Sequence, residues 1–276
     1  MSSITNITEE SLRSMSYVDF MAHINETNRC PGGKDSVRQL MQNTFLNSES
    51  KVLDVGCNTG YVSFEIGRTI KCDVTGLDIN ENMVAQSKNN NTDPIASKYV
   101  DFVVGDGQSL PFPDNSFDLV TSGGSTIFIP NLQKGLTEYK RVCKDWGFIG
   151  DINFFYGKEV PTKTIAKINE LLGIDIQPWN IDFFLNLYES VGLEKYHIYT
   201  GETHKPTKEE LKMYCKEMIQ NSQYGELSRE LQDAAFDKFY EYMELFYENN
   251  RYLSYGVFIY RKRPEEYKEQ ISLFGY

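Results

Sequence analysis

Short apolar segments alternate with helical patterns through the middle of the chain, from residue 51 to residue 156. The apolar segments are rich in Val, Ile, Leu and Phe, which is typical of strands buried on both faces of a parallel sheet. The intervening stretches place apolar residues three or four positions apart, as on one face of a helix. The predicted strands are 51–55, 73–78, 99–104, 117–121 and 148–155, and the predicted helices are 60–70, 81–89 and 132–144. This alternation predicts βαβ units, right-handed crossovers and a mostly parallel, Rossmann-like doubly wound α/β sheet.

The chain beyond residue 156 adds two more strands, which bring the predicted sheet to seven. Its helices carry typical boundary signals, with Pro161 in a first turn and with Gly173 and Gly192 at or just past an end. The predicted elements here are helices over 161–173 and 180–191 and strands over 196–200 and 252–261. Residues 201–250 contain two amphipathic helical patterns and are too long for a simple connector. They predict a helical insertion before the last strand.

The segment before the first strand, residues 1–48, is also predicted to be helical. Asn6, followed three residues later by Glu9, resembles an N-cap with its capping partner. A turn or loop over 28–33 separates this first helix from a second one around 37–45. The segment is either a packing layer or part of a lid. The predicted parts of the chain are thus an N-terminal helical cap (1–48), an α/β domain (49–262, with an insertion or lid at 201–250) and a polar tail (263–276).

The charge of the chain bears on its partners. The formal net charge is −11, from 28 basic and 39 acidic side chains, which weighs against a nucleic-acid partner. The five cysteines are scattered and form no CxxC pair, as is usual for reduced thiols in the cytoplasm. The start of the chain has no basic flank or apolar run, and no stretch has the length of a membrane span. We therefore expect a cytoplasmic protein that binds neither nucleic acid nor membrane, of undetermined oligomeric state.

A glycine-bearing turn between the first strand and the next helix is the first candidate binding element. It reads Lys51-Val-Leu-Asp-Val-Gly-Cys-Asn-Thr-Gly60. Gly56 and Gly60 remove Cβ where the backbone must turn sharply and let a ligand approach. The helix that follows leaves amide groups unpaired at its start, which suits a polar or anionic group. The alternative is an ordinary connection between a strand and a helix that happens to contain glycine.

Two carboxylates follow the next two predicted strands. Asp78 ends the second strand and could accept hydrogen bonds from both hydroxyl groups of a ribose. Asp106 follows the third strand and could accept from the amino group of adenine. Ile79 and Met83 could provide apolar walls for a purine, although Met83 fits the core of its helix equally well. Asp78 could also be a simple exposed residue at the end of a strand.

These motifs resemble those of the class I S-adenosylmethionine-dependent methyltransferases. The likeness spans about residues 50–156 and is weaker as far as residue 262. It is closest in character to the small-molecule branch that includes the ubiquinone and menaquinone type of methyltransferase. In place of the usual Pro-Gly-Gly turn before the fifth strand, this chain has Asp145-Trp-Gly147. The matching segments are Val52–Gly60, Gly76–Ile79, Gly105–Phe112, Ser116–Val120 and Glu138–Val142.

The resemblance implies S-adenosyl-L-methionine as cofactor and S-adenosyl-L-homocysteine as its product. It assigns Asp78 to the ribose, Asp106 and Gly107 to the adenine, and Ser122 to the neighbourhood of the sulfonium. Asn58 takes the place of a loop glycine, a position that varies within the family. The methionine part would be held by Asp54, Gly56, Cys57 and Gly60.

A dinucleotide-binding fingerprint competes with this interpretation. That fingerprint requires G-x-G-x-x-G, and the chain has Gly56, Asn58 and Tyr61 at the three glycine positions. The spacing therefore fails twice. The acid after the third strand also has no role in that fingerprint. The methyltransferase interpretation is preferred for both fold and cofactor.

We expect methyl transfer to O, N or C of a small organic metabolite, mainly through proximity and orientation. The three histidines, His23, His197 and His204, are better explained as packing or surface residues than as a base, so the catalytic residues stay unassigned. Asp151, in the middle of the fifth strand, has no obvious partners, and we predict no metal. The residues after the fourth strand contain no Asn-Pro-Pro-Tyr element of the kind used on nucleic acids.

The insertion is rich in aromatic residues, more than one helix face can hold. Some of them are expected to line an apolar pocket for the acceptor, together with residues 10–35. Two alternatives remain open: a peptide or protein methyltransferase, for which an acidic surface would suit a basic partner, and a non-catalytic module that binds the cofactor. The aromatic residues are Phe236, Phe239, Tyr240, Tyr242, Phe246 and Tyr247.

Overall fold

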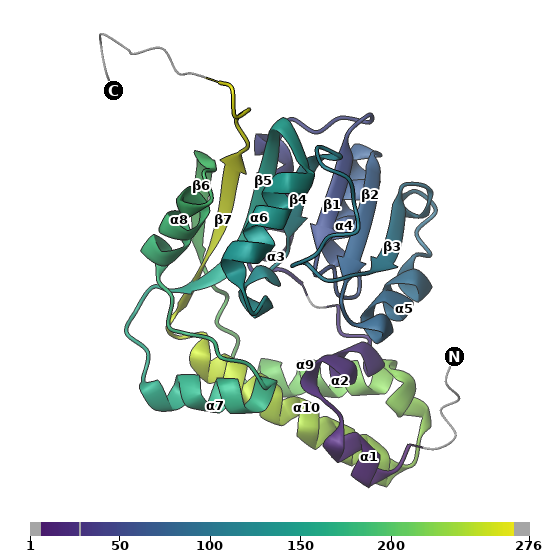
Figure 1. Cartoon of the computed structure of the whole chain (residues 1–276). Helices are drawn as coiled ribbons and strands as arrows, with labels where there is room; N and C mark the ends of the chain where they lie inside the picture. The colour runs from purple at the N-terminus through teal and green to yellow at the C-terminus, as the bar shows by residue number, and fades with distance from the viewer. Residues whose placement is uncertain (1–6, 28, 268–276) are drawn as a thin grey trace.

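A seven-stranded sheet forms the centre of the molecule, in the order β3-β2-β1-β4-β5-β7-β6 (Figure 1). This is a computed structural model, which describes residues 7–27 and 29–267. The strands are β1 (Lys51–Val55), β2 (Asp73–Asp78), β3 (Val100–Val104), β4 (Phe117–Ser122), β5 (Cys143–Tyr156), β6 (Glu194–Glu202) and β7 (Leu253–Arg261).

The first five strands are parallel, and β7 runs antiparallel between β5 and β6. The carboxyl ends of the parallel strands therefore meet at one edge of the sheet, the edge at which open α/β sheets bind ligands. The predicted α/β fold with a mostly parallel seven-stranded sheet is confirmed. The strand order reverses at the junction of β1 and β4, so the turn after β1 lies at a crevice between helices on opposite faces.

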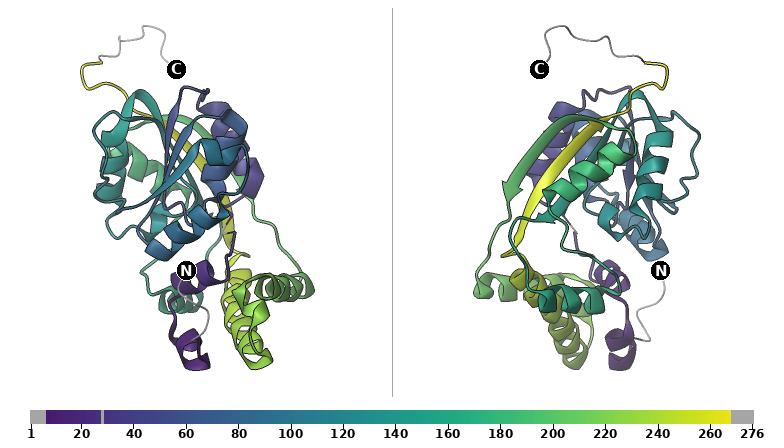
Figure 2. Two further views of the ribbon diagram at one scale, coloured as in Figure 1. Left: turned by 90° about the vertical axis from the view of Figure 1, so that its right-hand side faces the viewer. Right: turned by 60° about the vertical axis from the view of Figure 1, so that its left-hand side comes forward.

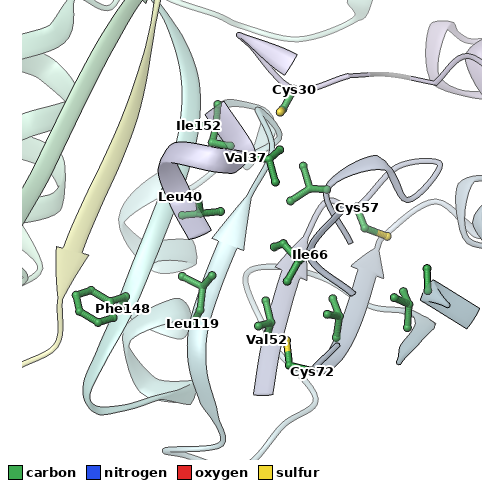
Figure 3. Close-up of a cluster of buried hydrophobic side chains, with 14 of the residues drawn as sticks. Cys30, Val37, Leu40, Val52, Cys57, Ile66, Cys72, Leu119, Phe148 and Ile152 are labelled. Carbon is green, nitrogen blue, oxygen red and sulfur yellow. The ribbon is translucent and has the colours of Figure 1, made fainter. Parts of the chain in front are cut away.

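Helices cover both faces of the sheet, as the two rotated views show (Figure 2). One face carries a cluster of buried residues from α3, α4 and the strands, including Leu40, Ile66 and Leu119 (Figure 3). The other face carries a second cluster, with Leu136 from α6 and Phe184 from α8. The helices that flank the sheet are α3 (Gly33–Asn43), α4 (Tyr61–Ile70), α5 (Glu81–Asn90), α6 (Leu132–Val142) and α8 (Ile181–Ser190).

Helix α3 packs on the sheet, although the sequence groups it with the N-terminal cap. A Cβ at Gly150 in β5 would lie 2.2 Å from Leu40 Cδ1, so the absence of a side chain there lets the helix approach closely. Val37 and Leu40 are buried in the sheet-face cluster. The division of the chain at residue 48 remains a prediction. Of the described helices before the first strand, only Glu9–Ser14 and Tyr17–His23 lie away from the sheet.

The remaining α-helices form a layer beyond the carboxyl edge of the parallel strands, below the sheet in Figure 1. A third cluster of buried residues holds this layer together, with Phe20 from α2, Cys215 from α9 and Phe239 from α10. We call these helices the cap. They are α1 (Glu9–Ser14), α2 (Tyr17–His23), α7 (Thr162–Leu172), α9 (Lys208–Asn221) and α10 (Arg229–Asn249). Among the described residues, no helix has the length and apolar character that crossing a membrane requires.

Several element boundaries differ from the predicted ones. The first helix is capped by Thr8, whose side chain accepts from the amide of Ser11 in a reciprocal capping box. Glu9 is instead the first helical residue, and Asn6 lies outside the described residues. Strand β5 begins at Cys143 rather than at residue 148, because the chain enters the sheet directly from α6. The predicted capping pair was wrong because the helix begins two residues later, where Thr8 and Ser11 cap its first backbone groups.

Candidate functional site

The turn after β1 takes the strained shape that its glycines permit. Gly56 has φ +69° and Gly60 has φ +97°, and Asn58 occupies the same left-handed region at φ +49°. The amides of Gly56 and Cys57 both donate to the carbonyl of Leu77, at 2.7 and 3.0 Å. The turn is thereby fixed against the end of β2.

Asp78 lies directly against this turn. Its carboxylate is 6% exposed and accepts from the amide of Asn58 through Oδ2 and from the amide of Asn80 through Oδ1, both at 2.9 Å. Burial raises the pKa of Asp78, and these amide hydrogen bonds lower it. The carboxylate is thus held in one orientation beside the glycine turn, and each oxygen retains further acceptor capacity.

Asp54, near the end of β1, is a second buried carboxylate at this edge. Its Oδ2 accepts from the hydroxyl of Ser63 in α4 at 2.6 Å. In the part of the chain that the structure describes, Oδ1 has no hydrogen-bond partner. Burial raises the pKa of Asp54 to about 6, opposed by the bond from Ser63. A buried acceptor without a donor is costly, so this oxygen suits a donor on a ligand.

Cys57 lies within the same turn and is buried. Burial and the nearby carboxylates of Asp54 and Asp78 raise the pKa of its thiol well above the ordinary value. The thiol therefore stays protonated at neutral pH, and its nucleophilicity is low. The geometry gives Cys57 a packing position in the turn.

The turn after β3, which contains Asp106 and Gly107, lies against the ends of β1 and β2. The amide of Gly105 donates to the carbonyl of Asp78 at 2.9 Å. Asp106 Oδ1 accepts from the amide of Gln108 at 2.8 Å, which shapes the turn. A Cβ at Gly107 would lie 3.1 Å from Val55 Cγ1, so a larger residue would press on the end of β1.

The two predicted apolar walls have different surroundings. Ile79 is 68% exposed at the mouth of the site and is free to cover a ligand. Met83 is 1% exposed and belongs to the buried cluster of the cap. The structure therefore supports the packing interpretation of Met83. Its side chain ties α5 to the cap, and a contact with adenine would require this packing to change.

Ser122 and the turn that follows it close the crevice from the side of β4. Ser122 is fully buried, and its hydroxyl accepts from the amide of Ser125 at 3.2 Å. Ser125 in turn donates its hydroxyl to the carbonyl of Gly56 at 2.7 Å and accepts from the amide group of Asn58 at 3.1 Å. Ser125 was not among the site residues predicted from sequence. Its position three residues after Ser122, in a Gly-Gly-Ser turn, was the available signal.

The segment after α2 crosses the mouth of the site and connects it to the cap. The hydroxyl of Thr59, in the glycine turn, donates to the carbonyls of Glu26 and Thr27 at 2.9 and 3.2 Å. The hydroxyl of Tyr214 in α9 lies 2.6 Å from both carboxylate oxygens of Glu26. We call this connection from Thr59 through Glu26 to Tyr214 the latch. It was not predictable from sequence, because 188 residues separate Tyr214 from Glu26.

His23, His204 and Asp151 lie outside the glycine turn and have separate surroundings. His23 is half-buried in the cap with its ring beside Tyr224, and His204 is exposed. Asp151 was expected to lack the neighbouring acids that a metal site would need. It is fully buried and accepts from the hydroxyl of Tyr188 in α8 at 2.6 Å. Within residues 7–27 and 29–267, no group of three or more His, Cys, Asp or Glu is arranged to hold a metal ion.

Comparison with known proteins identifies the element that carries this site. Residues 53–149 match a family model described as a methyltransferase domain. This part of the chain is a methyltransferase domain. All of the predicted cofactor-binding residues, from Asp54 to Ser122, lie inside it.

Curated relatives of the methyltransferase domain match over part of their length. Over 163 residues the chain is 33% identical to a sterol 24-C-methyltransferase of Gibberella zeae, covering 57% of this chain and 43% of the relative. Over 100 residues it is 35% identical to a demethylmenaquinone methyltransferase of Desulfitobacterium hafniense, covering 36% and 40%. The chain thus spans less than half the length of these named relatives.

Solved structures resemble this chain over most of its length. The MccD protein has a TM-score of 0.70 at 23% identity, covering 86% of this chain and 100% of that one. A putative sarcosine dimethylglycine methyltransferase from Galdieria sulphuraria has a TM-score of 0.65 at 18% identity, covering 83% and 84%. The [4+2]-cyclase SpnF has a TM-score of 0.69 at 19% identity, covering 89% and 93%. At these identities the likeness shows the fold.

The predicted family, the S-adenosylmethionine-dependent methyltransferases, and with it the cofactor, is confirmed by the domain match and the curated relatives. The residues present also fit the cofactor. The glycine turn lies against Asp78 at the carboxyl edge of the sheet, and Asp54 offers a buried oxygen that lacks a donor among the described residues. The role of each contacting residue remains a proposal.

Proposed function

We propose that this protein transfers a methyl group from S-adenosylmethionine to a small organic acceptor. One observation carries the proposal: three carboxylates converge on a glycine turn at the carboxyl edge of the sheet. Asp54, Asp78 and Asp106 come from three adjacent strands or the turns that follow them. This convergence, inside a methyltransferase domain, matches the polar groups of one nucleoside with an amino acid attached.

Each carboxylate has a distinct part in holding the cofactor. Asp78, fixed by two backbone amides, accepts from the ribose hydroxyls. The unpartnered Oδ1 of Asp54 attracts the ammonium of the methionine part. Asp106 accepts from the adenine amino group, with Gly107 letting the ring lie close and Ile79 covering it.

The cofactor supplies a methyl group already activated by its sulfonium. The protein therefore contributes orientation and exclusion of water, which can account for much of the rate. The turn from Ser122 to Ser125 fixes the wall near the end of β4, and the latch closes the mouth. The acceptor must reach this point from the side of the cap.

A small organic acceptor fits the way the cap is built. Phe239 and Tyr242 are buried in the cap's own core, whereas Phe246 and Tyr247 are only half-buried. The cap lies over the carboxyl edge of the parallel strands, on the side from which an acceptor would approach (Figure 1). The curated relatives named for sterol and demethylmenaquinone methylation are consistent with an apolar metabolite.

A second function has a specific observation in its favour. One neighbour with this fold is titled a [4+2]-cyclase, so a methyltransferase fold can serve other chemistry. The corresponding proposal is a protein that binds the cofactor without transferring its methyl group. Turnover separates the two: release of S-adenosylhomocysteine in the presence of an acceptor supports the transferase.

Calorimetric titration with S-adenosylhomocysteine tests the cofactor site. The Asp78→Ala variant should weaken binding by about 1–3 kcal/mol, because a charged acceptor for the ribose is lost. Asp101→Ala, in the neighbouring strand β3 and exposed to solvent, is the matched control and should bind as the wild type does. Failure of the wild-type protein to bind the product would refute the proposed function, and unchanged affinity in Asp78→Ala would refute the ribose role.

A further inference from the structure

Strand β5 extends beyond the end of its neighbour β4. Their last paired residues are Ser122, which ends β4, and Asp151. Beyond this point β5 continues to Tyr156 paired with β7. Asp151 therefore lies level with the end of β4, where the proposed function places the sulfonium, and Asn153 lies two residues further on.

A buried polar cluster surrounds this overhang on the face covered by α6 and α8. Asp151, Asn153 and Tyr188 are all fully buried. The hydroxyl of Tyr188 donates to Asp151 Oδ2 at 2.6 Å, and the side-chain amide of Asn153 donates to the Tyr188 oxygen at 3.4 Å. Beside them, the hydroxyls of Thr126 and Tyr139 lie 3.4 Å apart. Apolar residues fill the rest of this face, so the polar groups form an isolated island.

Two acceptor atoms of this cluster have no donor. Among the residues that the structure describes, Asp151 Oδ1 and Asn153 Oδ1 make no hydrogen bond. A buried unpaired acceptor costs about 1–3 kcal/mol, and more when it is charged. Two such atoms at one end of β5 are difficult to explain as packing. They are well placed to meet a donor carried by a bound molecule.

Building on the proposed function, we infer that Asp151 and Asn153 recognise the methyl acceptor through an O–H or N–H group and that Asp151 takes its proton. The acceptor class is therefore an alcohol, phenol or amine. A carbon acceptor such as an alkene offers no donor to these two oxygens.

The reaction balances with these groups alone. A lone pair on the acceptor oxygen or nitrogen forms the new bond to the methyl carbon as the bond from that carbon to sulfur breaks. The electron pair of the broken bond stays on sulfur, which becomes a neutral thioether. The proton of the acceptor passes to the Asp151 carboxylate, either directly or through the Tyr188 hydroxyl, and leaves to solvent after product release.

The ionisation of Asp151 is compatible with this role. Burial raises its pKa to about 6, and this rise is opposed chiefly by the hydrogen bond from the Tyr188 hydroxyl. At neutral pH the carboxylate is mostly ionised and can accept a proton. The other titratable groups facing it are Tyr188 from α8 and Tyr139 from α6, whose pKa values burial raises, so both stay protonated. Ser122 from β4 and Phe258 from β7 are uncharged.

The first test is turnover with a panel of alcohols, phenols, amines and alkenes, measured as release of S-adenosylhomocysteine. Turnover should be confined to acceptors with an O–H or N–H at the methylated atom. Asp151→Asn should lower kcat by about 100-fold or more, the usual effect of losing a general base. Its affinity for S-adenosylhomocysteine should stay within about twofold of the wild type, with Asp101→Asn as the control.

A pH profile distinguishes proton transfer from a structural role. The wild-type kcat should rise with pH through about 6 and level off above it. Tyr188→Phe removes a hydrogen bond that lowers the pKa of Asp151, so this rise should move to higher pH. Methylation of an alkene, or an Asp151→Asn variant with the kcat and pH profile of the wild type, would overturn the inference.

A second measurement needs no turnover. The carboxyl ¹³C resonance of Asp151 in the complex with S-adenosylhomocysteine is assigned by its loss in Asp151→Asn. It should titrate near pH 6. A midpoint near the ordinary value for aspartate, about 3.9, would overturn the inference even if no acceptor had been found. Loss of S-adenosylhomocysteine binding by the wild type would instead indicate failure of the proposed function.

Discussion

Burial of a carboxylate without a cation beside it is costly, and the described residues include two such groups that also have an unpaired oxygen. Asp54 is 1% exposed and Asp151 is fully buried, and each has one oxygen without a donor among the described residues. Each receives a hydroxyl donor on its other oxygen, from Ser63 and from Tyr188. These two buried groups lower the stability of the folded protein at the place where ligands are expected to bind, as is common in active sites.

The stability of the ligand-free protein should report the ionisation of Asp54. Its pKa is raised to about 6 when folded, above the unfolded value, so its contribution is fully present below about pH 4 and is lost as pH rises through about 6. Relative to Asp54→Asn, which cannot ionise, the wild type should lose about 1–3 kcal/mol between pH 4 and 7. Urea unfolding at a series of pH values measures this difference. Parallel stability curves for the two proteins would contradict the expectation.

Substitutions at two glycines in left-handed conformations can distinguish the cost of backbone strain from the cost of steric crowding. Gly173 has φ +67° and nothing within 4 Å of a built Cβ, so Gly173→Ala should cost about 1–2 kcal/mol through strain alone. Gly56 has φ +69°, and its built Cβ lies 2.2 Å from Ser125 Cβ. Gly56→Ala should therefore cost about 1–3 kcal/mol more and should also abolish cofactor binding. Denaturant unfolding and calorimetry measure the two effects. Equal losses for both variants would show that Ser125 moves aside freely.

Prediction from sequence gave the correct place in the sheet for residues of a local motif, whereas their contacts with the cofactor stay predictions. Asp54, Asp78 and Asp106 lie in or after short strands, and their convergence follows from the parallel sheet alone. It failed where the partner comes from a distant helix. Tyr188 lies 37 residues after Asp151, and no local pattern links the two. Met83 illustrates the opposite error. Its position in a motif suggested contact with adenine, but its side chain packs in the buried cluster of the cap.

At the scale of elements, the latch joins three segments that are distant in sequence. The glycine turn, the chain after α2 and helix α9 meet at Thr59, Glu26 and Tyr214. The hydrogen bond of Tyr214 is charge-assisted but partly exposed, since Tyr214 is 37% accessible. Its contribution is therefore moderate, and a moderate bond can open to let ligands enter and leave.

Loss of the Tyr214 hydroxyl should loosen the cap without unfolding it. In Tyr214→Phe we expect faster amide hydrogen exchange in α9 and in residues 24–27, together with faster dissociation of S-adenosylhomocysteine. Tyr240→Phe on α10, where the ring stacks on Phe236, is the matched control. Exchange by mass spectrometry and stopped-flow dissociation measure the two quantities. Exchange in α9 that matches the wild type would exclude a latch at this position.

The sequence predicted elements more reliably than their packing. The strands were found because short apolar runs bounded by turns are distinctive, and β2 has the bounds expected of it. The apolar face of α3 was also visible, but its pattern did not say which layer it faces. That choice depends on Gly150, more than a hundred residues away, whose missing side chain admits Leu40.

At the scale of the molecule, the cap is a second core built from distant parts of the chain. Its buried cluster combines Leu12 and Phe20 from the start of the chain with Ala235 and Phe239 from near its end. The two sheet-face clusters, in contrast, draw mainly on residues 30–193 and β7. The cap thus has its own source of stability, joined to the sheet through α5 and the latch.

A substitution that creates a large cavity in the cap should show whether the cap unfolds separately from the sheet. Phe239 is fully buried, with its ring 6.3 Å from that of Phe20 and 6.0 Å from that of Tyr214. Phe239→Ala should destabilise the cap by about 3–5 kcal/mol. We expect urea unfolding to split into two transitions, the first of them confined by hydrogen exchange to the cap helices. A single transition for the variant would mean that the cap and the sheet unfold as one unit.

The cap is built from segments that are far apart in the sequence, and this affects how the protein folds during synthesis. The side-chain amide of Gln223 donates to the carbonyl of His23, a bond that spans 200 residues. Ribosomes add about 5–20 residues per second, so roughly 10–40 s pass between the synthesis of the two partners. During that interval the sheet can assemble strand by strand, whereas Leu12, Phe20 and Met21 have nothing to pack against. Helices α1 and α2 are therefore a natural place for a chaperone to bind during synthesis, and the cap can close over the sheet only after α9 and α10 have been made.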